Sequence, residues 1–211
     1  MNNFSDIDLE KQQKIINSAL EEFSTYGYSN ASTNRIVKRA GISKGLLFYY
    51  FQNKQELLNF LFDYAIGYMM EHYVDQIDSD RRDFFERYQQ QRTLKRSIYQ
   101  ENPYLFGFLS GYYYQFRNEM ELPVELEQRL TKLEMDISEK LHSNLDMDMF
   151  REDMELSEVF TYIKWLLSGY EADLMKEVGD DLASVDWDFY FKRDATSLDN
   201  VKKLFYKKEY C

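Results

Sequence analysis

A short segment of the chain combines basic, aromatic and glycine residues in a pattern that could bind nucleic acid. Residues 33–51 read TNRIVKRAGISKGLLFYYF. In the second half, Leu47, Tyr50 and Phe51 fall three and four positions apart, so they share one face of a helix. The opposite face carries Lys44, Gly45, Phe48 and Tyr49. A short helix with one apolar face and one basic face is typical of a helix that enters the DNA major groove.

The first half of the segment predicts a preceding helix and a tight turn. Thr33 is a suitable N-cap, because its hydroxyl can accept hydrogen bonds from backbone N–H groups two or three residues on. Gly41 stands where a helix needs a left-handed residue to end, and Ser43 can cap the next helix. The whole segment therefore predicts a helix-turn-helix.

Side chains that would support catalysis or a metal site are sparse. Two histidines, His72 and His142, and one cysteine, Cys211, do not form the clustered ligand set of a zinc site. The sequence holds neither a glycine-rich phosphate loop nor the G-x-S-x-G pattern of a serine nucleophile. We therefore expect no enzymatic activity, no cofactor and no metal.

The composition favours an all-α fold of about nine helices. Two prolines and eight glycines among 211 residues leave few helix breakers. The alternating apolar runs and Asn-Gly turns of a sheet are missing from the sequence. It also lacks an apolar stretch of about 18 residues, the length that crosses a membrane. With one cysteine and a polar, acidic start, the chain is expected in the cytoplasm, without a membrane partner.

Charge is distributed unevenly along the chain. The formal net charge is −11, which would oppose binding to DNA. Residues 1–60, however, hold seven Lys or Arg and six Asp or Glu, whereas residues 61–211 hold 19 and 31. The cations of the first part cluster on the predicted helix-turn-helix, so a local phosphate-binding face is compatible with the acidic remainder.

Apolar periodicity and breakers place the other helices. Gly27 is expected to end the first helix, and Asn53 to cap the fourth. Outside the helix-turn-helix, helices are expected over residues 8–26, 53–73, 79–100, 103–116, 124–145, 153–178 and 187–206.

From Ile15 to Leu58 the sequence resembles the N-terminal domain of the TetR family of transcriptional repressors. The matching features, in order, are the helix IINSALEEF, Tyr26-Gly27-Tyr28, Thr33, Ala40-Gly41-Ile42-Ser43, Lys44-Gly45, the aromatic run to Phe51, and Lys54 before Glu56-Leu57. The resemblance implies a DNA-binding domain over residues 1–52. Residues 53–211 would form a helical domain for effector binding and dimerisation.

The resemblance also implies which residues meet a palindromic double-stranded operator. They are Thr33, Arg35, Ser43, Lys44, Gly45, Leu46, Phe48, Tyr49 and Lys54. Lys44 would reach base edges or phosphate, and Gly45 would let the backbone approach the groove. Leu46 and Phe48 stand where many members have a small polar residue and a tyrosine, so packing is the alternative role for both. Because these two residues differ from the family pattern, the operator sequence is not predicted.

An aromatic segment suggests a ligand site in the second domain. Residues 104–116 carry seven aromatic side chains, interrupted by Gly107 and Gly111. An ordinary aromatic core would explain any one of them. The family resemblance nevertheless implies a pocket for a small-molecule effector, and the acidic body favours an aromatic or cationic one. The candidate ligand-binding residues are Tyr68, Phe108, Tyr112, Tyr113 and Trp165.

We predict a ligand-responsive repressor that acts as a homodimer. Helices 153–178 and 187–206 would form the dimer surface, with Phe160, Ile163 and Leu167 in contact with the partner. Two alternatives remain open. One is a DNA-binding regulator controlled by a protein partner or by no effector, which a closed core near residues 103–116 would favour. The other is a helical interaction protein without a DNA function.

Overall fold

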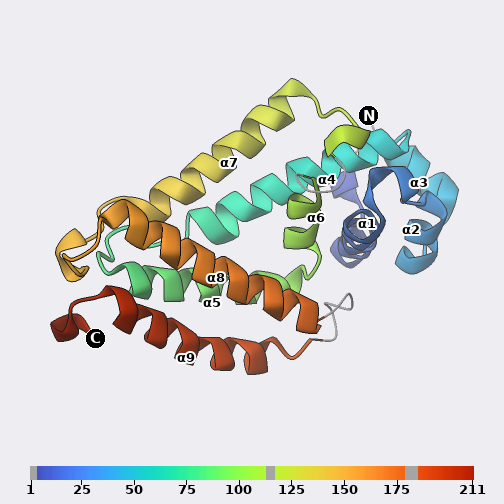
Figure 1. The fold of residues 1–211 in the computed structure, drawn as a ribbon. Helices are drawn as coiled ribbons and strands as arrows, with labels where there is room; N and C mark the ends of the chain where they lie inside the picture. The colour runs from blue at the N-terminus through green and yellow to red at the C-terminus, as the bar shows by residue number, and fades with distance from the viewer. Residues whose placement is uncertain (1–3, 113–116, 179–184) are drawn as a thin grey trace. The chain divides into compact units, whose positions relative to one another are not determined.

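The computed structural model describes residues 4–112, 117–178 and 185–211 (Figure 1). Over these residues the chain forms nine α-helices and several short 3₁₀ or π turns, and it has no β-sheet. The helices are α1 (Leu9–Asn30), α2 (Thr33–Ala40), α3 (Lys44–Tyr50), α4 (Lys54–Met69), α5 (Phe84–Glu101), α6 (Leu105–Gly111), α7 (Val124–His142), α8 (Leu156–Val178) and α9 (Trp187–Phe205). The predicted all-α class is confirmed.

The first helix differs from its prediction at the C-terminal end. Gly27 leaves helical geometry, with φ 68° and ψ −178°, as a residue without a Cβ can. The chain then forms another helical turn, so α1 continues beyond this kink to Asn30. Gly27 therefore bends the helix and does not end it.

Helix α5 begins five residues later than predicted. Asp83 explains the start, because its Oδ1 accepts hydrogen bonds from the backbone N–H groups of Phe85 at 2.8 Å and Glu86 at 3.1 Å. A carboxylate in this position satisfies donors that have no partner inside the helix. The capped first turn fixes which residues of α5 face the rest of its unit.

Helix α7 ends three residues earlier than predicted, at His142. The buried guanidinium of Arg87 accounts for the ending, because it donates hydrogen bonds to the carbonyl oxygens of Lys140, Leu141 and Ser143. Asn144 follows with φ 57°, a left-handed conformation that asparagine tolerates. The last carbonyls of α7 are thus satisfied by a side chain from α5.

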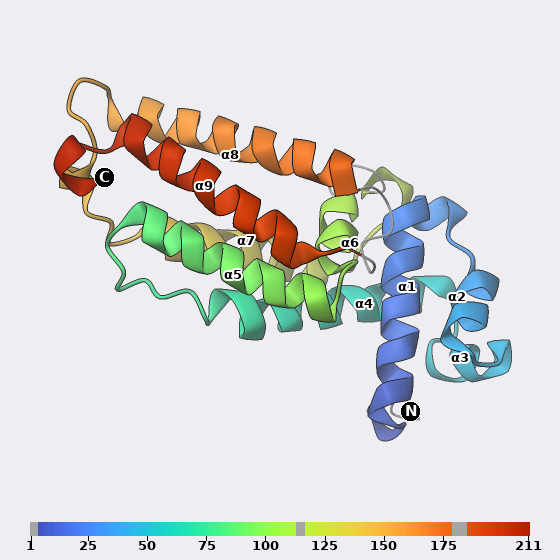
Figure 2. The same cartoon turned by 90° about the horizontal axis from the view of Figure 1, so that it is seen from below.

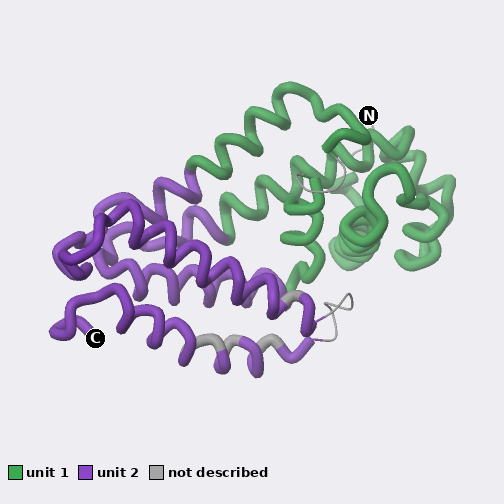
Figure 3. The backbone as a smooth tube through the Cα atoms, in the orientation of Figure 1, with its two compact units in different colours: residues 1–72, 101–135 green, residues 73–100, 136–211 purple. Residues whose placement is uncertain are grey.

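The chain divides into two compact units, each assembled from two segments (Figure 3). Unit 1 comprises residues 1–72 and 101–135, and unit 2 comprises residues 73–100 and 136–211. The functional boundary after residue 52 remains a prediction.

Unit 1 has an aromatic core that joins its two segments. Phe108 of α6 packs against Phe62 of α4, with ring centroids 4.6 Å apart, and against Phe23 of α1 at 6.4 Å. All three side chains are fully buried. Helix α6 therefore belongs to the hydrophobic core that supports the helix-turn-helix.

Unit 2 is a helical bundle in which α5, α8 and α9 lie side by side (Figures 1 and 2). Its apolar core comprises Phe84, Phe85, Leu145, Phe150, Val159, Ile163, Leu198, Phe205 and Tyr206. Phe84 of α5 meets Phe160 of α8 with ring centroids 5.6 Å apart. This contact and its neighbours define one end of a cavity described below.

Candidate nucleic-acid interface and effector site

Gly41 closes α2 and sets the turn of the helix-turn-helix. It has φ 67° and ψ 33°, a left-handed conformation that favours glycine. Its N–H donates to the carbonyl of Lys38 at 3.4 Å, and the N–H of Ile42 donates to that of Val37 at 3.0 Å. These two bonds form a Schellman ending, as expected for a glycine in this position.

Ser43 caps α3 and fixes the start of this helix. Its Oγ accepts a hydrogen bond from the N–H of Leu46 at 3.1 Å, which confirms the predicted cap. At the start of α2 the assignment differs by one residue, because Ser32 occupies the cap position and Thr33 is the first helical residue. Thr33 is half-buried there.

Helix α3 presents the predicted basic face to solvent. Leu47 is buried on the opposite side, whereas Lys44, Gly45 and Tyr49 are exposed, Tyr49 to 56%. A Cβ built on Gly45 would meet only the Oγ of Ser43, at 4.0 Å. The backbone is therefore open to close approach from outside on this face, which we call the α3 face and define by Ser43, Lys44, Gly45 and Tyr49.

The two residues that depart from the family pattern lie between core and surface. Leu46 and Phe48 are both half-buried. The ammonium of Lys44 lies 5.7 Å from the ring centroid of Phe48, within the range of a cation–π contact. Phe48 can therefore orient the lysine that the prediction places in the groove. Its own contact with DNA remains a prediction.

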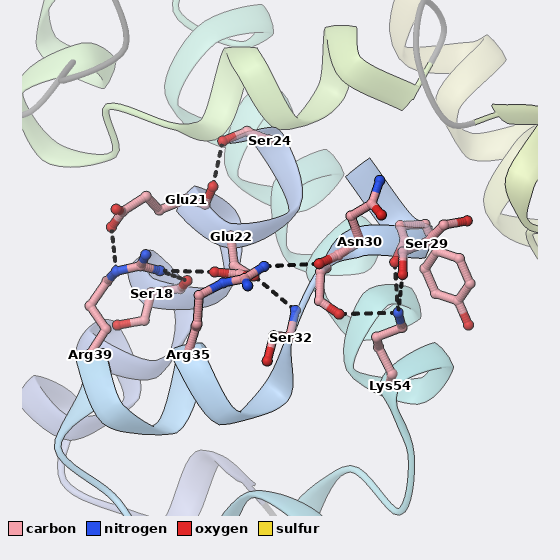
Figure 4. Close-up of polar contacts among 12 residues, drawn as sticks. Ser18, Glu21, Glu22, Ser24, Ser29, Asn30, Ser32, Arg35, Arg39 and Lys54 are labelled. Carbon is pink, nitrogen blue, oxygen red and sulfur yellow. Dashed lines mark hydrogen bonds and ion pairs between the residues drawn. The ribbon is translucent and has the colours of Figure 1, made fainter. Parts of the chain in front are cut away.

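Arg35 has an intramolecular partner that the sequence did not reveal. Its Nε donates to Oε1 of Glu22 at 2.8 Å, and its Nη2 donates to the carbonyl of Asn30 at 2.8 Å (Figure 4). Glu22 is fully buried, and it also accepts a hydrogen bond from the N–H of Ser32 at 2.8 Å. The hydrogen bond that Arg35 donates to Glu22 raises the pKa of the Arg35 guanidinium. Arg35 thus ties α2 to α1, and this leaves fewer donors for phosphate.

Arg39 extends the same network along α2. Its Nε lies 3.1 Å from Oε2 of Glu21, and its Nη1 donates to the carbonyl of Ser18 at 3.1 Å (Figure 4). The guanidinium also lies 3.5 Å from Oε2 of Glu22. Two acidic side chains of α1 therefore hold both arginines of α2.

Lys54 binds the C-terminal end of α1 in this conformation. Its ammonium donates to the carbonyl oxygens of Tyr28, Ser29 and Ala31, at 2.7, 3.4 and 3.2 Å. A lysine has three donors, so these bonds use all of them. Burial lowers the pKa of Lys54. The predicted contact of Lys54 with the DNA backbone would require these bonds to be exchanged.

Lys38 and Lys44 remain the available cations of the helix-turn-helix. Both are exposed, and neither has a hydrogen bond or ion pair within the parts of the chain that the structure describes. The positive charge that faces solvent is thus concentrated at the end of α2 and the start of α3. This placement fits phosphate binding near a capped helix N-terminus.

The predicted ligand-binding residues of unit 1 are engaged within that unit. Phe108 is fully buried, and Tyr112 packs on Phe62 with ring centroids 5.1 Å apart. The hydroxyl of Tyr112 donates to Oε1 of Glu127 at 3.1 Å, and burial, followed by this bond, raises its pKa. The hydroxyl of Tyr68 donates to Glu101. These contacts are those of a packed aromatic core.

Two further predicted ligand residues lie elsewhere. Trp165 belongs to unit 2, where its side chain is 65% exposed on α8. Tyr113 lies outside the described residues. Two cavities formed by described residues, one in each unit, are lined by none of Tyr68, Phe108, Tyr112 and Trp165.

A cavity of about 460 Å³ lies in unit 2, between α5, α8 and the end of α7. We call it the α5–α8 cavity. It is lined by Phe84, Tyr88, Gln91, Lys95, Leu141, His142, Phe160, Thr161, Ile163, Lys164, Leu167, Ser168 and Glu171. A signal for it was present in the sequence, because Gln91 and Lys95 continue the apolar face of Phe84 and Tyr88 at helical spacing. Polar residues on a core face often mark a binding site.

The predicted dimer residues face the inside of unit 2. Ile163 is only 2% exposed and belongs to the core, and Phe160 and Leu167 pack against that core and line the α5–α8 cavity. Their assignment to a partner surface is therefore inconsistent with their position. Among its described side chains, the large apolar ones that α8 leaves exposed are Leu156, Tyr162, Trp165 and Leu166.

Other classes of site find little support among the described residues. They contain no group of three or more His, Cys, Asp or Glu side chains placed to hold a metal ion. Within the same residues, no helix has the length and apolar character that would cross a membrane.

Comparisons with known proteins agree with this geometry. Residues 15–60 match the family model for bacterial regulatory proteins of the tetR family. The fatty acid metabolism regulator protein of Bacillus subtilis is 33% identical over 67 residues, which are 32% of this chain and 34% of that protein. The chain thus matches only about a third of the length of this relative.

Two longer matches extend over the second half of the chain. The probable acrEF/envCD operon repressor of Escherichia coli is 21% identical over 203 residues, 93% of this chain and 87% of that protein. The crystal structure of a TetR family transcriptional regulator from Chloroflexus aurantiacus covers 99% of both chains with a TM-score of 0.64 and 18% identity. The N-terminal helix-turn-helix domain of this chain is thus that of the TetR family of transcriptional regulators, and the chain has the fold of a TetR family structure.

Proposed function

We propose that the protein is a homodimeric repressor that binds a palindromic DNA operator and leaves it when a small-molecule effector binds. The observation that carries the proposal is the α3 face. Ser43 caps the helix, and Lys44, Gly45 and Tyr49 are exposed beside the buried Leu47. This arrangement brings a cation, an open backbone and a hydroxyl to one side of a short helix, as groove binding requires.

A dimer follows from the small number of base pairs that one short helix can read. Two α3 helices would have to lie about 34–36 Å apart, or a multiple of that distance, to enter successive major grooves. Tyr162, Trp165 and Leu166 of α8 are exposed and apolar, and they form the partner surface in this proposal. They replace the inward-facing Phe160, Ile163 and Leu167 in that role.

The α5–α8 cavity is the effector site in this proposal. Its volume lies within the range of about 300–1,000 Å³ that is typical of small-molecule sites. The effector must prefer the state with low DNA affinity, by a coupling free energy of about 1–3 kcal/mol in typical cases. By linkage, operator DNA must then weaken effector binding by the same factor. Repression is supported by the similarity to the probable acrEF/envCD operon repressor of Escherichia coli.

A second candidate is a DNA-binding regulator that responds to a protein partner or to no effector. The closed aromatic packing around α6, where Phe108 and Tyr112 meet Phe62, favours this candidate. It shares the DNA-binding half of the proposal. An interaction protein without a DNA function is less compatible with the exposed α3 face.

Fluorescence anisotropy with labelled duplexes tests the proposal. The wild-type chain should bind DNA from its own promoter region more tightly than a scrambled duplex of equal length and composition, at fixed salt. Equal affinity for both duplexes, without any effector, would falsify the proposed function. Release is then tested by titrating effectors into the preformed complex, and the protein-partner alternative is supported if DNA binds specifically but no small molecule releases it.

A further inference from the structure

We infer that the α5–α8 cavity binds an elongated amphipathic acid: an apolar chain with a carboxylate at one end and an N–H or O–H donor beside it. The inference rests on the proposed function, since it names the class of effector. Three observations carry it, namely the polarity gradient along the cavity, a buried acceptor without a partner, and an unpaired lysine.

The cavity changes from apolar to charged along its length. At one end the rings of Phe84 and Phe160 are 5.6 Å apart, and at the other end Lys95 and Glu171 form an ion pair at 3.0 Å. Each helix advances eleven residues between these contacts, so α5 and α8 run in the same direction with the cavity between them. Eleven helical residues span about 16 Å. A long ligand that is apolar at one end and polar towards the other matches this gradient.

Gln91 supplies a hydrogen-bond acceptor inside the cavity. Gln91 is 5% exposed and lines the cavity, and its Oε1 has no hydrogen-bond partner among the described residues. A buried polar atom of this kind is costly to leave unsatisfied. A ligand N–H or O–H placed at the level of Gln91 would satisfy it. Purely hydrocarbon ligands would not.

Lys164 gives the cavity an excess of positive charge. Lys95 is paired with Glu171, whereas the exposed Lys164 has no hydrogen bond or ion pair within the described segments. His142 lines the cavity with its Nδ1 2.8 Å from the carbonyl of Ser138, the contact of a donating N–H. An anion is therefore favoured over the cationic effector that the acidic composition predicts.

The positions of Lys164 and Gln91 set the spacing of the ligand's polar groups. The ring contact at one end of the cavity and the ion pair at the other fix how α5 and α8 lie beside each other. Counting along both helices from these contacts places Tyr88 level with Lys164, and Gln91 level with Leu167. Lys164 therefore lies three residues, about 4.5 Å along the axis, from the level of Gln91, on the side of Phe84 and Phe160. A carboxylate separated from an amide N–H by one carbon can reach both groups, as in an N-acylated amino acid. The apolar chain would leave the carbon between these two groups, as the side chain of that amino acid, and extend towards Phe84 and Phe160.

Isothermal titration calorimetry with the full chain and four probes tests the inference without DNA. The probes are N-acetyl-2-aminodecanoic acid, its methyl ester, its N-methyl analogue and octyltrimethylammonium. The ester lacks the charge, the N-methyl compound lacks the N–H donor, and the last probe reverses the charge. We expect N-acetyl-2-aminodecanoic acid to bind at least about tenfold more tightly than each of the other three, because charge-assisted and buried hydrogen bonds are lost in them.

Two variants assign the preferences to their residues. Lys164→Gln should remove most of the preference for the acid over its ester, and Gln91→Leu should remove the preference for the N–H compound over its N-methyl analogue. Lys176→Gln is the matched control, because Lys176 is an exposed lysine of the same helix outside the cavity. It should change neither preference.

The outcomes separate this inference from the proposed function. The inference is overturned if the acid does not bind at about 1 mM, if it binds no better than the ester or the cation, or if both variants keep the wild-type preferences. If the acid binds as expected but does not release operator DNA in the anisotropy assay, the ligand class stands and the effector role fails. Specific DNA binding without acid binding leaves the DNA-binding half intact and overturns the ligand class.

Discussion

Oε1 of Glu22, in α1, accepts a hydrogen bond from Nε of Arg35, in α2, at 2.8 Å, and the glutamate side chain is fully buried. The same oxygen accepts from the N–H of Ser32, the residue at the start of α2. A single carboxylate therefore fixes where α2 begins and how it lies on α1. The arrangement gives the helix-turn-helix its orientation before DNA binds.

We expect Glu22→Leu to lower the free energy of unfolding by about 1–3 kcal/mol, because the N–H of Ser32 loses its acceptor and α2 loses its anchor. Urea denaturation followed by circular dichroism measures the change. DNA affinity should fall as well, since α2 would no longer hold α3 in place. Glu10→Gln is the control, because Glu10 forms an exposed pair with Lys14. A Glu22→Leu chain as stable and as tight on DNA as the wild type would contradict this role.

Lys44 and Lys54 should separate DNA recognition from stability. Lys44→Ala should weaken operator binding by about 1–3 kcal/mol if the lysine reads a base, with little change in unfolding, because its ammonium has no hydrogen bond within the described residues. Anisotropy and urea denaturation on the same preparation measure both. Lys203→Ala, an exposed lysine of α9, removes the same charge in unit 2 and serves as control.

Replacement of Lys54 should change stability more than DNA binding, the opposite of what is expected for Lys44. Its three hydrogen bonds hold the end of α1, so Lys54→Met should lower the free energy of unfolding by about 1–2 kcal/mol. The salt dependence of DNA binding should stay near that of the wild type. A flatter salt dependence with unchanged stability would instead identify Lys54 as a phosphate contact, as the family resemblance implies.

The exposed face of α8 predicts how the chain assembles. Trp165→Glu should give a soluble, folded monomer, because it places a charge on the apolar surface assigned to the partner. Ile163→Asp should unfold or precipitate the chain, since this side chain is only 2% exposed in the core of unit 2. Sedimentation velocity and circular dichroism measure the two outcomes. A Trp165→Glu dimer of wild-type affinity would place the interface elsewhere.

Buried tyrosines predict the response to alkaline pH. Burial raises the pKa of Tyr88 to about 12, from an ordinary value of 10.0. The folded state then keeps a proton that the unfolded state loses, so stability present below pH 10 is lost as the pH rises towards 12. Each such tyrosine contributes a slope of about 1.4 kcal/mol per pH unit. Tyr88→Phe should make the fall between pH 10 and pH 12 shallower in urea denaturation, and Tyr210→Phe, an exposed control, should not.

Local signals in the sequence were sufficient to predict the helix-turn-helix. Gly41, Ser43 and Asn53 act as predicted, because capping depends on a side chain and on backbone groups within a few residues. The exposure of Lys44 and Tyr49 followed from helical periodicity. These features require no information about distant parts of the chain.

Contacts between segments far apart in the chain could not be predicted. Helix α8 has two apolar faces, and the position of α5 decides which of them is covered. Periodicity alone assigns Ile163 and Trp165 equally well to a core. Likewise, the pairing of Glu22 with Arg35 joins α1 to α2 across thirteen positions. The aromatic residues of α6 were recognised as a group, but their density in the sequence does not distinguish a packed core from a cavity.

The assembly of unit 1 from two segments also affects how the chain matures on the ribosome. The helix-turn-helix is synthesised first, yet Phe23 and Phe62 are covered by Phe108 of α6, which follows after the whole of α5. Until α6 leaves the exit tunnel, the nascent DNA-binding domain carries an uncovered aromatic surface. Its completion is thus postponed until part of unit 2 has been translated, and the nascent chain needs protection from aggregation during this delay.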